Sequence, residues 1–283
     1  MTTPASLGLA IRHHTGFTYA GAAKASYNEA RMTPVSGPNQ TVRQAQITVR
    51  PSVPFFTYVD YFGTTVTSFD IQEVHSQLEV EARSTVESRA ASREVPLAWS
   101  DIRSERVHDQ YGEFLSTSSR TGLPEEVTSL VSAMPHSMDA HEVAIYVGEL
   151  VRGQVAYVPG ATSVSSTAQE AWQRGKGVCQ DITHVTLGLL RALGIPARYV
   201  SGYLYPSSIE EIGVVAAGQS HAWIEYFSGS WTGWDPTNAV PETERHIVVG
   251  RGRDYDDVAP LKGIYQGPAS SNLGVVVEMS RLF

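Results

Sequence analysis

Cysteine is scarce in this sequence: Cys179 is the only one among 283 residues. A single cysteine excludes an internal disulfide and any zinc site built on C-x-x-C pairs. The chain also lacks an apolar run of the roughly 20 residues needed to cross a bilayer. Its first residues, MTTPASLGLAIRHHTGF, have no charged segment ahead of a long apolar stretch, so no signal peptide is expected. These absences favour a cytoplasmic protein with no membrane partner.

Positive charge is also in short supply, with 21 Lys and Arg against 29 Asp and Glu and a net charge of −8. A broad basic surface for nucleic acid is therefore not expected. Hydrophobic residues make up 42% and charged residues 18%, which is ordinary for a globular protein. The length suits one large domain or two modest ones, and it leaves the oligomeric state open.

Residues 1 to about 90 carry the alternating pattern of half-buried β-strands. In TVRQAQITVRP, Ala45, Ile47 and Val49 alternate with polar residues, and QLEVEARSTVE repeats this period of two. Two β-rich runs on either side of Phe62-Gly63, in FFTYVDYFGTTVTSFDI, predict a hairpin. We expect a small β-sandwich or barrel over residues 1–95.

Helical patterns begin after a polar, irregular stretch from about 90 to 120, which suggests a domain boundary. Helices are predicted near 123–134, 139–150, 167–175 and 179–193, and Asp139 and Thr167 are the expected starts of the second and third. Strands are predicted in ARYVSGYLYP, SHAWIEYF and WTGWDPT. Helices followed by an antiparallel sheet indicate an α+β core over residues 96–268. Residues 269–283 hold a last strand that could join either sheet.

The lone cysteine lies in GKGVCQDITHV, where a glycine-containing loop leads into an apolar helix. Free amide N–H groups and the helix dipole at such a position lower a thiol pKa and favour the reactive thiolate. A buried structural cysteine is the alternative, and the local pattern leaves both open. If the thiol is reactive, we expect Gly175 and Gly177 to clear space for a substrate carbonyl.

A reactive thiol needs a base, and most histidines are poor candidates. Six lie in the first strand or in polar stretches and are expected to be solvated or capping: His13, His14, His75, His108, His136 and His141. His184 lies five residues after the thiol, about 140° around the helix, which favours packing or hydrogen bonding over partnership.

His221 is a better candidate because it opens the strand SHAWIEYF. If Ser228–Ser230 form a three-residue loop, Phe227 pairs with Trp231, and opposed residue numbers sum to 458. Asp235 is then diagonal to His221 on the same face, within reach of a side-chain contact. Asp235 could instead be only a turn residue before Pro236. A thiol, an imidazole and a carboxylate in this arrangement would supply nucleophile, base and orienting acid.

Three blocks, GKGVCQDITHVTLGLLRALGIPARYVSGYL, SHAWIEYF and GWDPTNAV, resemble the bacterial transglutaminase-like family of papain-like cysteine enzymes. The N-terminal stretches HHTGFTYAGAAKASYNEARMTP and DYFGTTVTSFD resemble the β domain that precedes this core, and RDYDDVAPLKGIYQG fits its tail. The resemblance thus covers nearly the whole chain and implies a papain-like α+β core behind a small β domain.

The resemblance implies that Cys179 is the nucleophile, His221 the general base and Asp235 the acid that orients it. The Cys179 backbone N–H would be one oxyanion donor. The second donor stays open among Gln173, Tyr157, Trp172 and Trp223, each of which could equally be a packing residue. Asp181 matches the acid of the G-x-C-x-D pattern and is expected to support the loop, and His184 to be a supporting residue.

The expected reaction is acyl transfer on a peptide or amide substrate through a Cys thioester. Water as acceptor gives a peptidase or amidase, towards which the resemblance leans. An amine acceptor gives a transglutaminase or amide-forming acyltransferase, and a non-catalytic peptide-binding module is the rival from another class. No cofactor and no metal requirement are expected. A redox role for the thiol is disfavoured because no second cysteine could resolve a sulfenic acid.

Overall fold

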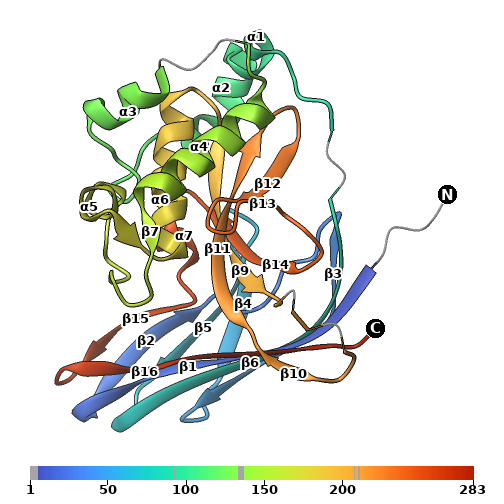
Figure 1. Cartoon of the computed structure of the whole chain (residues 1–283). Helices are drawn as coiled ribbons and strands as arrows, with labels where there is room; N and C mark the ends of the chain where they lie inside the picture. Colours follow the sequence, from blue (N-terminus) through green and yellow to red (C-terminus); the bar gives the residue numbers. More distant parts are fainter. Residues whose placement is uncertain (1–5, 92–93, 133–136, 207, 210) are drawn as a thin grey trace.

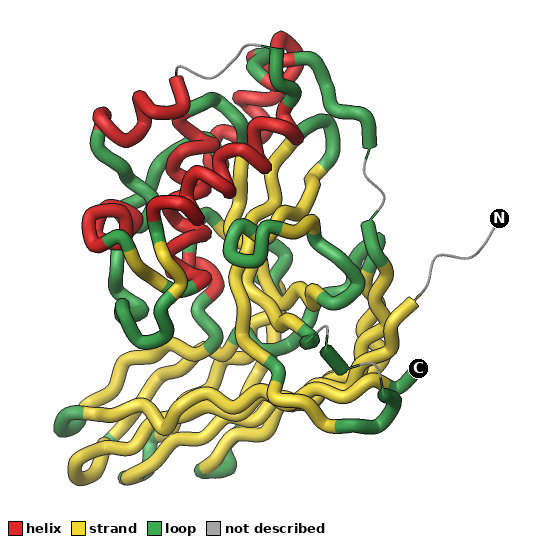
Figure 2. Tube along the Cα trace, viewed as in Figure 1, coloured by secondary structure: helices red, strands yellow, loops and turns green. Residues whose placement is uncertain are grey.

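Three antiparallel sheets and a group of helices make up the fold of the computed structural model (Figures 1 and 2). The structure describes residues 6–91, 94–132, 137–206, 208–209 and 211–283. The helices cover one face of the core sheet, and the other two sheets lie together at the opposite end of the molecule (Figure 1). Among the described residues, no helix is long and apolar enough to cross a membrane.

The large N-terminal sheet has the strand order β10-β16-β1-β6-β3. Its strands span the following residues: β1 Ser6–Ala23, β3 Gln40–Arg50, β6 His75–Arg89, β10 Val215–Ala217 and β16 Ser270–Arg281. The small N-terminal sheet has the order β15-β2-β5-β4, with β2 Ala25–Ala30, β4 Phe55–Val59, β5 Thr65–Ile71 and β15 Leu261–Gln266. The predicted hairpin around Phe62-Gly63 is confirmed, since β4 pairs with β5 across the turn from Asp60 to Thr64.

The C-terminal strand joins the large N-terminal sheet, which answers a question the pattern left open. β16 runs antiparallel to β1, with Leu9 opposite Arg281 and Tyr19 opposite Ser270. β15 likewise pairs with β2 of the small sheet. The end of the chain therefore returns to the β region formed by its beginning.

The core sheet has the order β13-β12-β11-β9-β14. Its strands span the following residues: β9 Ala197–Leu204, β11 Gln219–Phe227, β12 Trp231–Asp235, β13 Val240–Pro241 and β14 His246–Gly252. The helices are α3 Glu125–Ser132, α4 Ala140–Gln154, α5 Ala168–Arg174, α6 Cys179–Ala192 and α7 Tyr255–Val258, and the short strands β7 Ala156–Tyr157 and β8 Lys176–Gly177 pair in parallel. This α+β core agrees with the predicted fold class.

Helix starts followed the predicted local rules. Asp139 caps α4 through the His141 and Glu142 N–H groups, and Thr167 caps α5 through the Glu170 N–H. α3 begins at Glu125, after Pro124, and the predicted extension to Met134 lies outside the described residues.

The prediction of an irregular stretch from 90 to 120 is wrong. Two short helices lie there, α1 Trp99–Ile102 and α2 Glu105–Tyr111, followed by a 3₁₀ turn at Gly112–Phe114. Ile102, Val107 and Phe114 are buried. Because each of these short segments buries a single side chain, no apolar stripe is long enough to reveal a helix.

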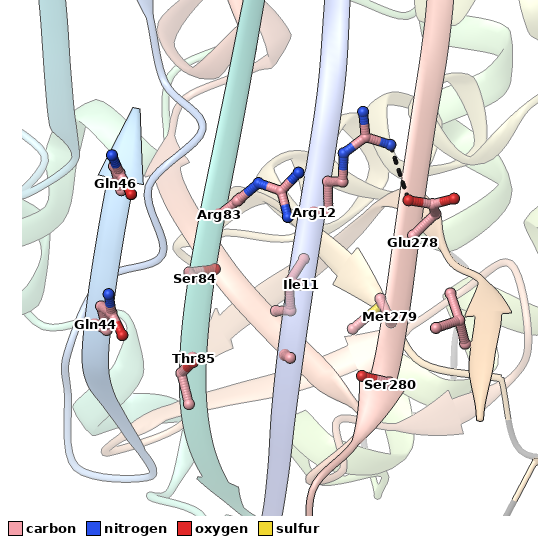
Figure 3. Close-up of a pocket in the computed structure, with 12 residues that line it drawn as sticks. Ile11, Arg12, Gln44, Gln46, Arg83, Ser84, Thr85, Glu278, Met279 and Ser280 are labelled. Atoms are coloured by element: carbon pink, nitrogen blue, oxygen red, sulfur yellow. Dashed lines mark hydrogen bonds and ion pairs between the residues drawn. The ribbon is translucent and has the colours of Figure 1, made fainter. Parts of the chain in front are cut away.

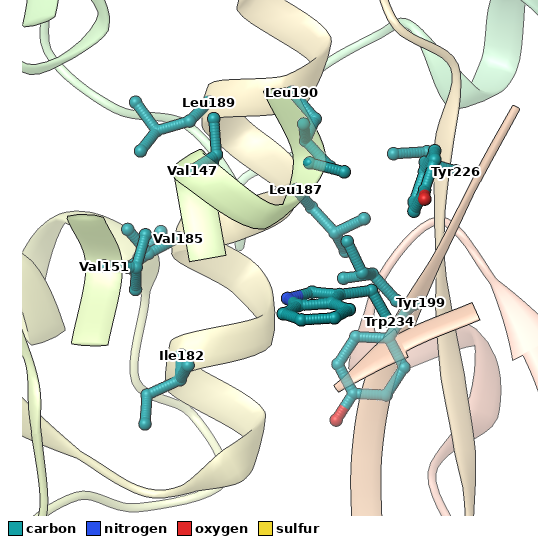
Figure 4. Close-up of a cluster of buried hydrophobic side chains, with 14 of the residues drawn as sticks. Val147, Val151, Ile182, Val185, Leu187, Leu189, Leu190, Tyr199, Tyr226 and Trp234 are labelled. Carbon is teal, nitrogen blue, oxygen red and sulfur yellow. The ribbon is translucent and has the colours of Figure 1, made fainter. Parts of the chain in front are cut away.

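α6 is the central helix of the core. Figure 4 shows Ile182, Val185 and Leu189 of α6 beside Val147 and Val151 of α4, with aromatic residues of the core sheet on the other side. Every α6 residue from Gln180 to Arg191 is buried. Full burial of each Leu, Ile or Val stabilises by about 1.5–3 kcal/mol, so this packing holds both ends of α6 firmly in place.

The large N-terminal sheet packs one face against the core sheet. Leu9 and Ile11 of β1 share a buried cluster with Tyr203 of β9 and Ile247 of β14. Arg12 alternates to the opposite face, where it forms ion pairs with Glu81 and Glu278. Figure 3 shows this outer face, a hollow of about 370 Å³ with polar side chains from neighbouring strands.

Three histidines contradict the expectation that they are solvated. His13 and His141 are buried against the hydroxyls of Tyr203 and Tyr226, at 2.9 and 2.8 Å, and His75 lies 3.3 Å from Ser26 Oγ. Strand alternation turns His13 towards the core sheet, and tertiary contacts that no local pattern shows enclose the others. His108 is exposed, as expected, and His136 lies outside the described residues.

Candidate active site

Cys179 is the first residue of α6, and its side chain is only partly buried. The backbone turns into the helix at Val178, whose N–H donates to Asp181 Oδ2 at 2.8 Å. The first N–H groups of a helix have no partner within it and carry the positive end of its dipole. The thiol thus lies where an anion is stabilised, and its side chain is not fully enclosed.

Asp181 is a buried support of the loop before the thiol. Besides the Val178 N–H, its Oδ2 accepts from the Thr162 hydroxyl at 2.5 Å. Burial raises the pKa of Asp181, partly offset by these two hydrogen bonds. Its position agrees with the expectation that it supports the loop.

The two glycines of this loop have roles other than the expected one. A Cβ on Gly177 would lie 2.7 Å from the Asp181 Cβ, so this glycine lets Asp181 fold back over the loop. Gly175 ends α5 in the left-handed region, with φ of 62°. Both glycines thus have structural roles, and the expectation that they clear space for a substrate carbonyl stays a prediction.

The pairing of β11 with β12 confirms the predicted register. Phe227 is opposite Trp231 and Ile224 opposite Trp234, which gives the sum of 458. His221 Nε2 lies 2.7 Å from Asp235 Oδ2, and both side chains are buried. A three-residue loop therefore brings together two side chains that are 14 residues apart.

His221 also interacts with Cys179. Since Nε2 faces Asp235, Nδ1 is the ring nitrogen left for the sulfur. Burial lowers the pKa of His221, but hydrogen bonds to Asp235 and Cys179 and the charges of both outweigh it and raise this pKa to about 10. The surroundings thus favour the protonated, imidazolium form of His221.

Asp235 receives hydrogen bonds from five donors. Oδ1 accepts the backbone N–H groups of Thr237 and Asn238, and Oδ2 accepts from His221, the Asn238 side-chain amide and His246. Burial raises the pKa of this carboxyl, but the hydrogen bonds outweigh it and hold the pKa well below its usual range. Asp235 therefore stays charged and is fixed in orientation, so it is more than a turn residue.

His246 on β14 is a residue that the sequence analysis missed. Its Nδ1 accepts the Thr243 backbone N–H at 3.1 Å, so the proton of the neutral ring is on Nε2, which lies 3.3 Å from Asp235 Oδ2. Leu204 of β9 pairs with Gln219 of β11 on one side and with His246 of β14 on the other. This pairing places the start of β14 near the start of β11, where His221 lies. A local pattern carries no signal for it, because the contact depends on the order of strands in the sheet.

The side chains of His221, Asp235 and His246 could also be read as metal ligands, because their polar atoms lie within 4.8 Å of one another. The hydrogen-bond geometry accounts for the cluster in another way. Both Nε2 atoms face the same carboxylate oxygen, and His246 Nδ1 is occupied by a backbone N–H. Imidazole must offer a free lone pair to bind a metal, so these residues do not fit an ion in this arrangement.

Trp223 lies beside His221 and is fully buried. Its ring is nearly parallel to the imidazole, at 24° and 6.1 Å between centroids, and its Nε1–H donates to Glu242 at 2.9 Å. Since this is the only N–H of the indole, Trp223 has no donor left for an oxyanion. It forms one wall of the histidine site.

The other candidate donors differ in where they lie. Tyr157 is half-exposed on β7, and its pKa is raised, first by burial and then by the charge of Cys179. Gln173 is exposed on α5, and Trp172 packs against the core. The second oxyanion donor therefore stays a prediction.

His184 is a packing residue in the structure. It is buried, its Nε2 accepts the Tyr255 N–H at 3.2 Å, and its ring contacts Tyr199. Burial, together with the charges of Arg120 and Arg191, lowers its pKa to about 3. A neutral, enclosed imidazole of this kind supports α6 and does not exchange protons with the thiol.

Two family models match the chain. Residues 9–87 match the bacterial transglutaminase-like N-terminal region, and residues 113–236 match the transglutaminase-like superfamily. An uncharacterized protein of Mycobacterium leprae is 41% identical over 96% of this chain and 98% of its own length. An uncharacterized protein of Mycobacterium tuberculosis is 29% identical over 95% of this chain and 91% of its own.

A solved structure shares the fold over nearly the whole chain. It is the crystal structure of a Cytophaga hutchinsonii protein proposed to be a cysteine protease, with a TM-score of 0.78 and 19% identity, covering 99% of this chain and 92% of that one. At this identity the likeness concerns the fold, including the arrangement of the N-terminal sheets and the core.

Proposed function

The chain belongs to the bacterial transglutaminase-like family, and on that premise we propose that it is a cysteine hydrolase of peptides or amides acting through a thioester. The observation that carries the proposal is His221, which interacts with Asp235 on one side and Cys179 on the other. This is the nucleophile, base and orienting acid of covalent acyl transfer.

In the first step the Cys179 thiolate attacks the substrate carbonyl carbon and forms a C–S bond. The negative charge moves to the carbonyl oxygen, where the Cys179 backbone N–H is the first donor and the Tyr157 hydroxyl the second candidate. The C–N bond then breaks, and His221 gives its proton to the departing nitrogen. Asp235 keeps the imidazole in the required orientation throughout.

In the second step an acceptor releases the acyl group from the sulfur. His221 takes a proton from water as the water attacks the thioester, the C–S bond breaks and the thiolate is restored. An amine in place of water gives a transamidation with the same three residues. We favour water because the Cytophaga hutchinsonii protein of the same fold is proposed to be a protease, which is an argument by analogy.

The test is the reactivity of Cys179 at low pH. Iodoacetamide at pH 5.5–6.5 should alkylate Cys179 at least tenfold faster than a free cysteine, whose pKa is about 8.5. His221→Ala should remove this advantage, whereas His108→Ala, which changes an exposed histidine, should not. Alkylation no faster than that of free cysteine would overturn the proposal.

A peptide library then distinguishes the outcomes of the reaction. Cleavage that requires Cys179 and is unchanged by excess small amine supports hydrolysis. Products that carry the added amine support transamidation. A reactive thiol with no product in either reaction favours the non-catalytic peptide-binding alternative.

A further inference from the structure

An acid that no step of the reaction uses lies behind the histidine of the site. The partly buried Glu242 accepts the Nε1–H of Trp223 at 2.9 Å, and the indole is stacked on the imidazole of His221. Among the described residues, this is the only side-chain hydrogen bond of Glu242, and no ion pair involves it. The carboxylate is therefore dedicated to the indole and is linked through it to His221.

Two glycines make room for this arrangement. A Cβ on Gly202 of β9 would lie 2.6 Å from the Cη2 atom of Trp223. A Cβ on Gly233 of β12 would lie 2.5 Å from the Glu242 Cβ and would also collide with its Oε2. The Gly233 carbonyl accepts the Glu242 N–H at 3.2 Å. A side chain at either glycine would displace the indole or the carboxylate, because a packed interior has no spare volume.

The N-terminal region packs against the same indole. Trp223 is fully buried in a small cluster with Val200 and Val248, and Val35 packs against this cluster. Gln40 ties the segment after Val35 to β14, since its side-chain amide donates to the Val248 carbonyl and accepts the Val248 N–H, both at 2.8 Å. Both parts of the chain therefore fix the orientation of the indole.

Glu242 lies among charged groups from several elements. It lines a cavity of about 390 Å³ together with these titratable residues: Arg89 of β6, Glu94 ahead of α1, Arg198 of β9, Glu225 of β11, and His246 and Arg251 of β14. Arg198 and Arg251 already pair with Glu225. Burial and the charge of Glu225 raise the pKa of Glu242 to about 7, against the opposing effects of the indole and the two arginines. Glu242 thus changes between a neutral and a charged acceptor near neutral pH.

We propose that Glu242 is a positioning residue for the reaction: it holds the indole of Trp223, which in turn holds the imidazole of His221. The inference rests on the proposed function and adds to it a residue that acts through another. A charged acceptor forms a stronger hydrogen bond than a neutral one, so the indole is held most firmly when Glu242 is ionised. An imidazole that can tilt is less often aligned with Asp235 and Cys179, and a misplacement of about 1 Å can lower a rate about 10²-fold.

The first test is the pH dependence of peptide cleavage in Glu242→Gln. The glutamine amide can accept the Trp223 N–H but stays neutral at every pH. Below about pH 6 the variant should cleave at the native rate, and above about pH 8 its kcat should be about tenfold lower, with KM nearly unchanged. The matched control Glu94→Gln changes an exposed carboxylate of the same cavity and should keep the native profile.

Two outcomes of this test would contradict the inference. Identical profiles of the native protein and Glu242→Gln would overturn it and leave the proposed function standing, since cleavage would continue. A loss of the same size at every pH would show that Glu242 acts by packing and not by its charge.

Trp223→Phe separates the hydrogen bond from the stacked ring. Phenylalanine keeps an aromatic ring beside His221 but has no N–H for Glu242. We expect kcat to fall about tenfold or more above pH 8, and Glu242→Gln in this background to cause no further change, because the link is already broken. Urea unfolding checks that both variants are folded. Losses that simply add would show that the two residues act independently.

A spectroscopic measurement distinguishes failure of this inference from failure of the proposed function. By NMR, the indole N–H signal of Trp223, assigned by its loss in Trp223→Phe, should shift with a midpoint near pH 7, and this shift should be absent in Glu242→Gln. Above about pH 8, the low-field proton signal of the hydrogen bond between His221 and Asp235 should be sharper in the native protein than in Glu242→Gln, because a held imidazole exchanges this proton more slowly.

The two signals do not depend on turnover. Both signals as expected, in a protein that cleaves no peptide, would keep the positioning contacts and reject the hydrolase. An indole signal that does not titrate, or a low-field signal that is the same in both proteins, would reject the inference whatever the rate of cleavage.

Discussion

The two faces of β11 are equally buried but differ in chemistry. On one face Ala222, Ile224 and Tyr226 pack in the apolar core around α6. On the other, His221, Trp223 and Glu225 each make directional contacts, with Asp235, Glu242 and two arginines. Apolar packing depends mainly on volume, whereas a buried polar network depends on each partner and its geometry.

β11 thus serves both the stability of the core and the geometry of the site. The apolar face fixes the strand against α6, whose first residue is Cys179. The polar face then sets the orientation of His221 relative to that residue. Substitutions on the apolar face should consequently change mainly the free energy of unfolding, whereas substitutions of His221 or its partners should change mainly the reactivity of Cys179.

The largest effect should follow Asp235→Asn. An amide cannot stabilise the imidazolium and can hold the wrong tautomer, so we expect turnover to fall about 10³-fold or more. The cleavage rate of a peptide found in the library measures it, and alkylation of Cys179 near pH 6 should slow as well. Asp101→Asn, at an exposed position of α1, is the control. Turnover within tenfold of the native rate would mean that Asp235 does not orient His221.

Glu225→Gln should have the largest effect on stability. Glu225 is buried between Arg198 and Arg251, and breaking such a group costs about 3–5 kcal/mol because the cations remain. Urea unfolding at pH 7 measures the loss. A destabilisation below about 1 kcal/mol would show that water replaces the carboxylate.

The same residue makes stability depend on pH. Burial raises the pKa of Glu225, but the charges of Arg251 and Arg198 outweigh it and lower the pKa from 4.5 to about 2. Its contribution is therefore complete above about pH 5 and is lost as the pH falls towards 2. The free energy of unfolding of the native protein should decline more steeply over this window than that of Glu225→Gln.

Ile224→Ala tests the apolar face, with an expected destabilisation of about 2–5 kcal/mol from lost burial and a cavity. Urea unfolding measures it, at a temperature where the variant stays folded. The pH dependence of Cys179 alkylation should remain that of the native protein. A shifted profile would show that the two faces are not independent.

The smallest effect should come from His246→Leu, which removes one of the five donors to Asp235. We expect about a tenfold lower kcat, the value of a hydrogen bond to a charged group, with KM nearly unchanged. His246→Gln, whose amide can donate in the same place, should recover most of the rate. Equal losses in both variants would indicate packing and not a positioning hydrogen bond.

Local rules predicted much of the fold and the centre of the site. Caps at Asp139 and Thr167 and the apolar stripe of α6 depend on neighbours within one turn. The β11–β12 register depends only on the length of the loop between them, so His221 and Asp235 could be paired in advance. Contacts of this kind are short in sequence and have few alternatives.

Contacts between distant segments could not be predicted in this way. The short helices α1 and α2 bury too few residues to show a periodicity, and three histidines thought to be solvated are enclosed by other elements. His246 reaches Asp235 because β14 pairs with β9. Which strands become neighbours depends on packing of the whole chain.

The amino-acid sequence by itself determined the thiol at a helix start, the histidine and the acid that faces it, because each is specified by local periodicity and one short loop. Only the tertiary structure decided what surrounds them: the second histidine on Asp235 and the return of β16 to the first strand. The physical reason is that burial and strand order are properties of the whole packed molecule, whereas a cap or a hairpin register is a property of a few consecutive residues.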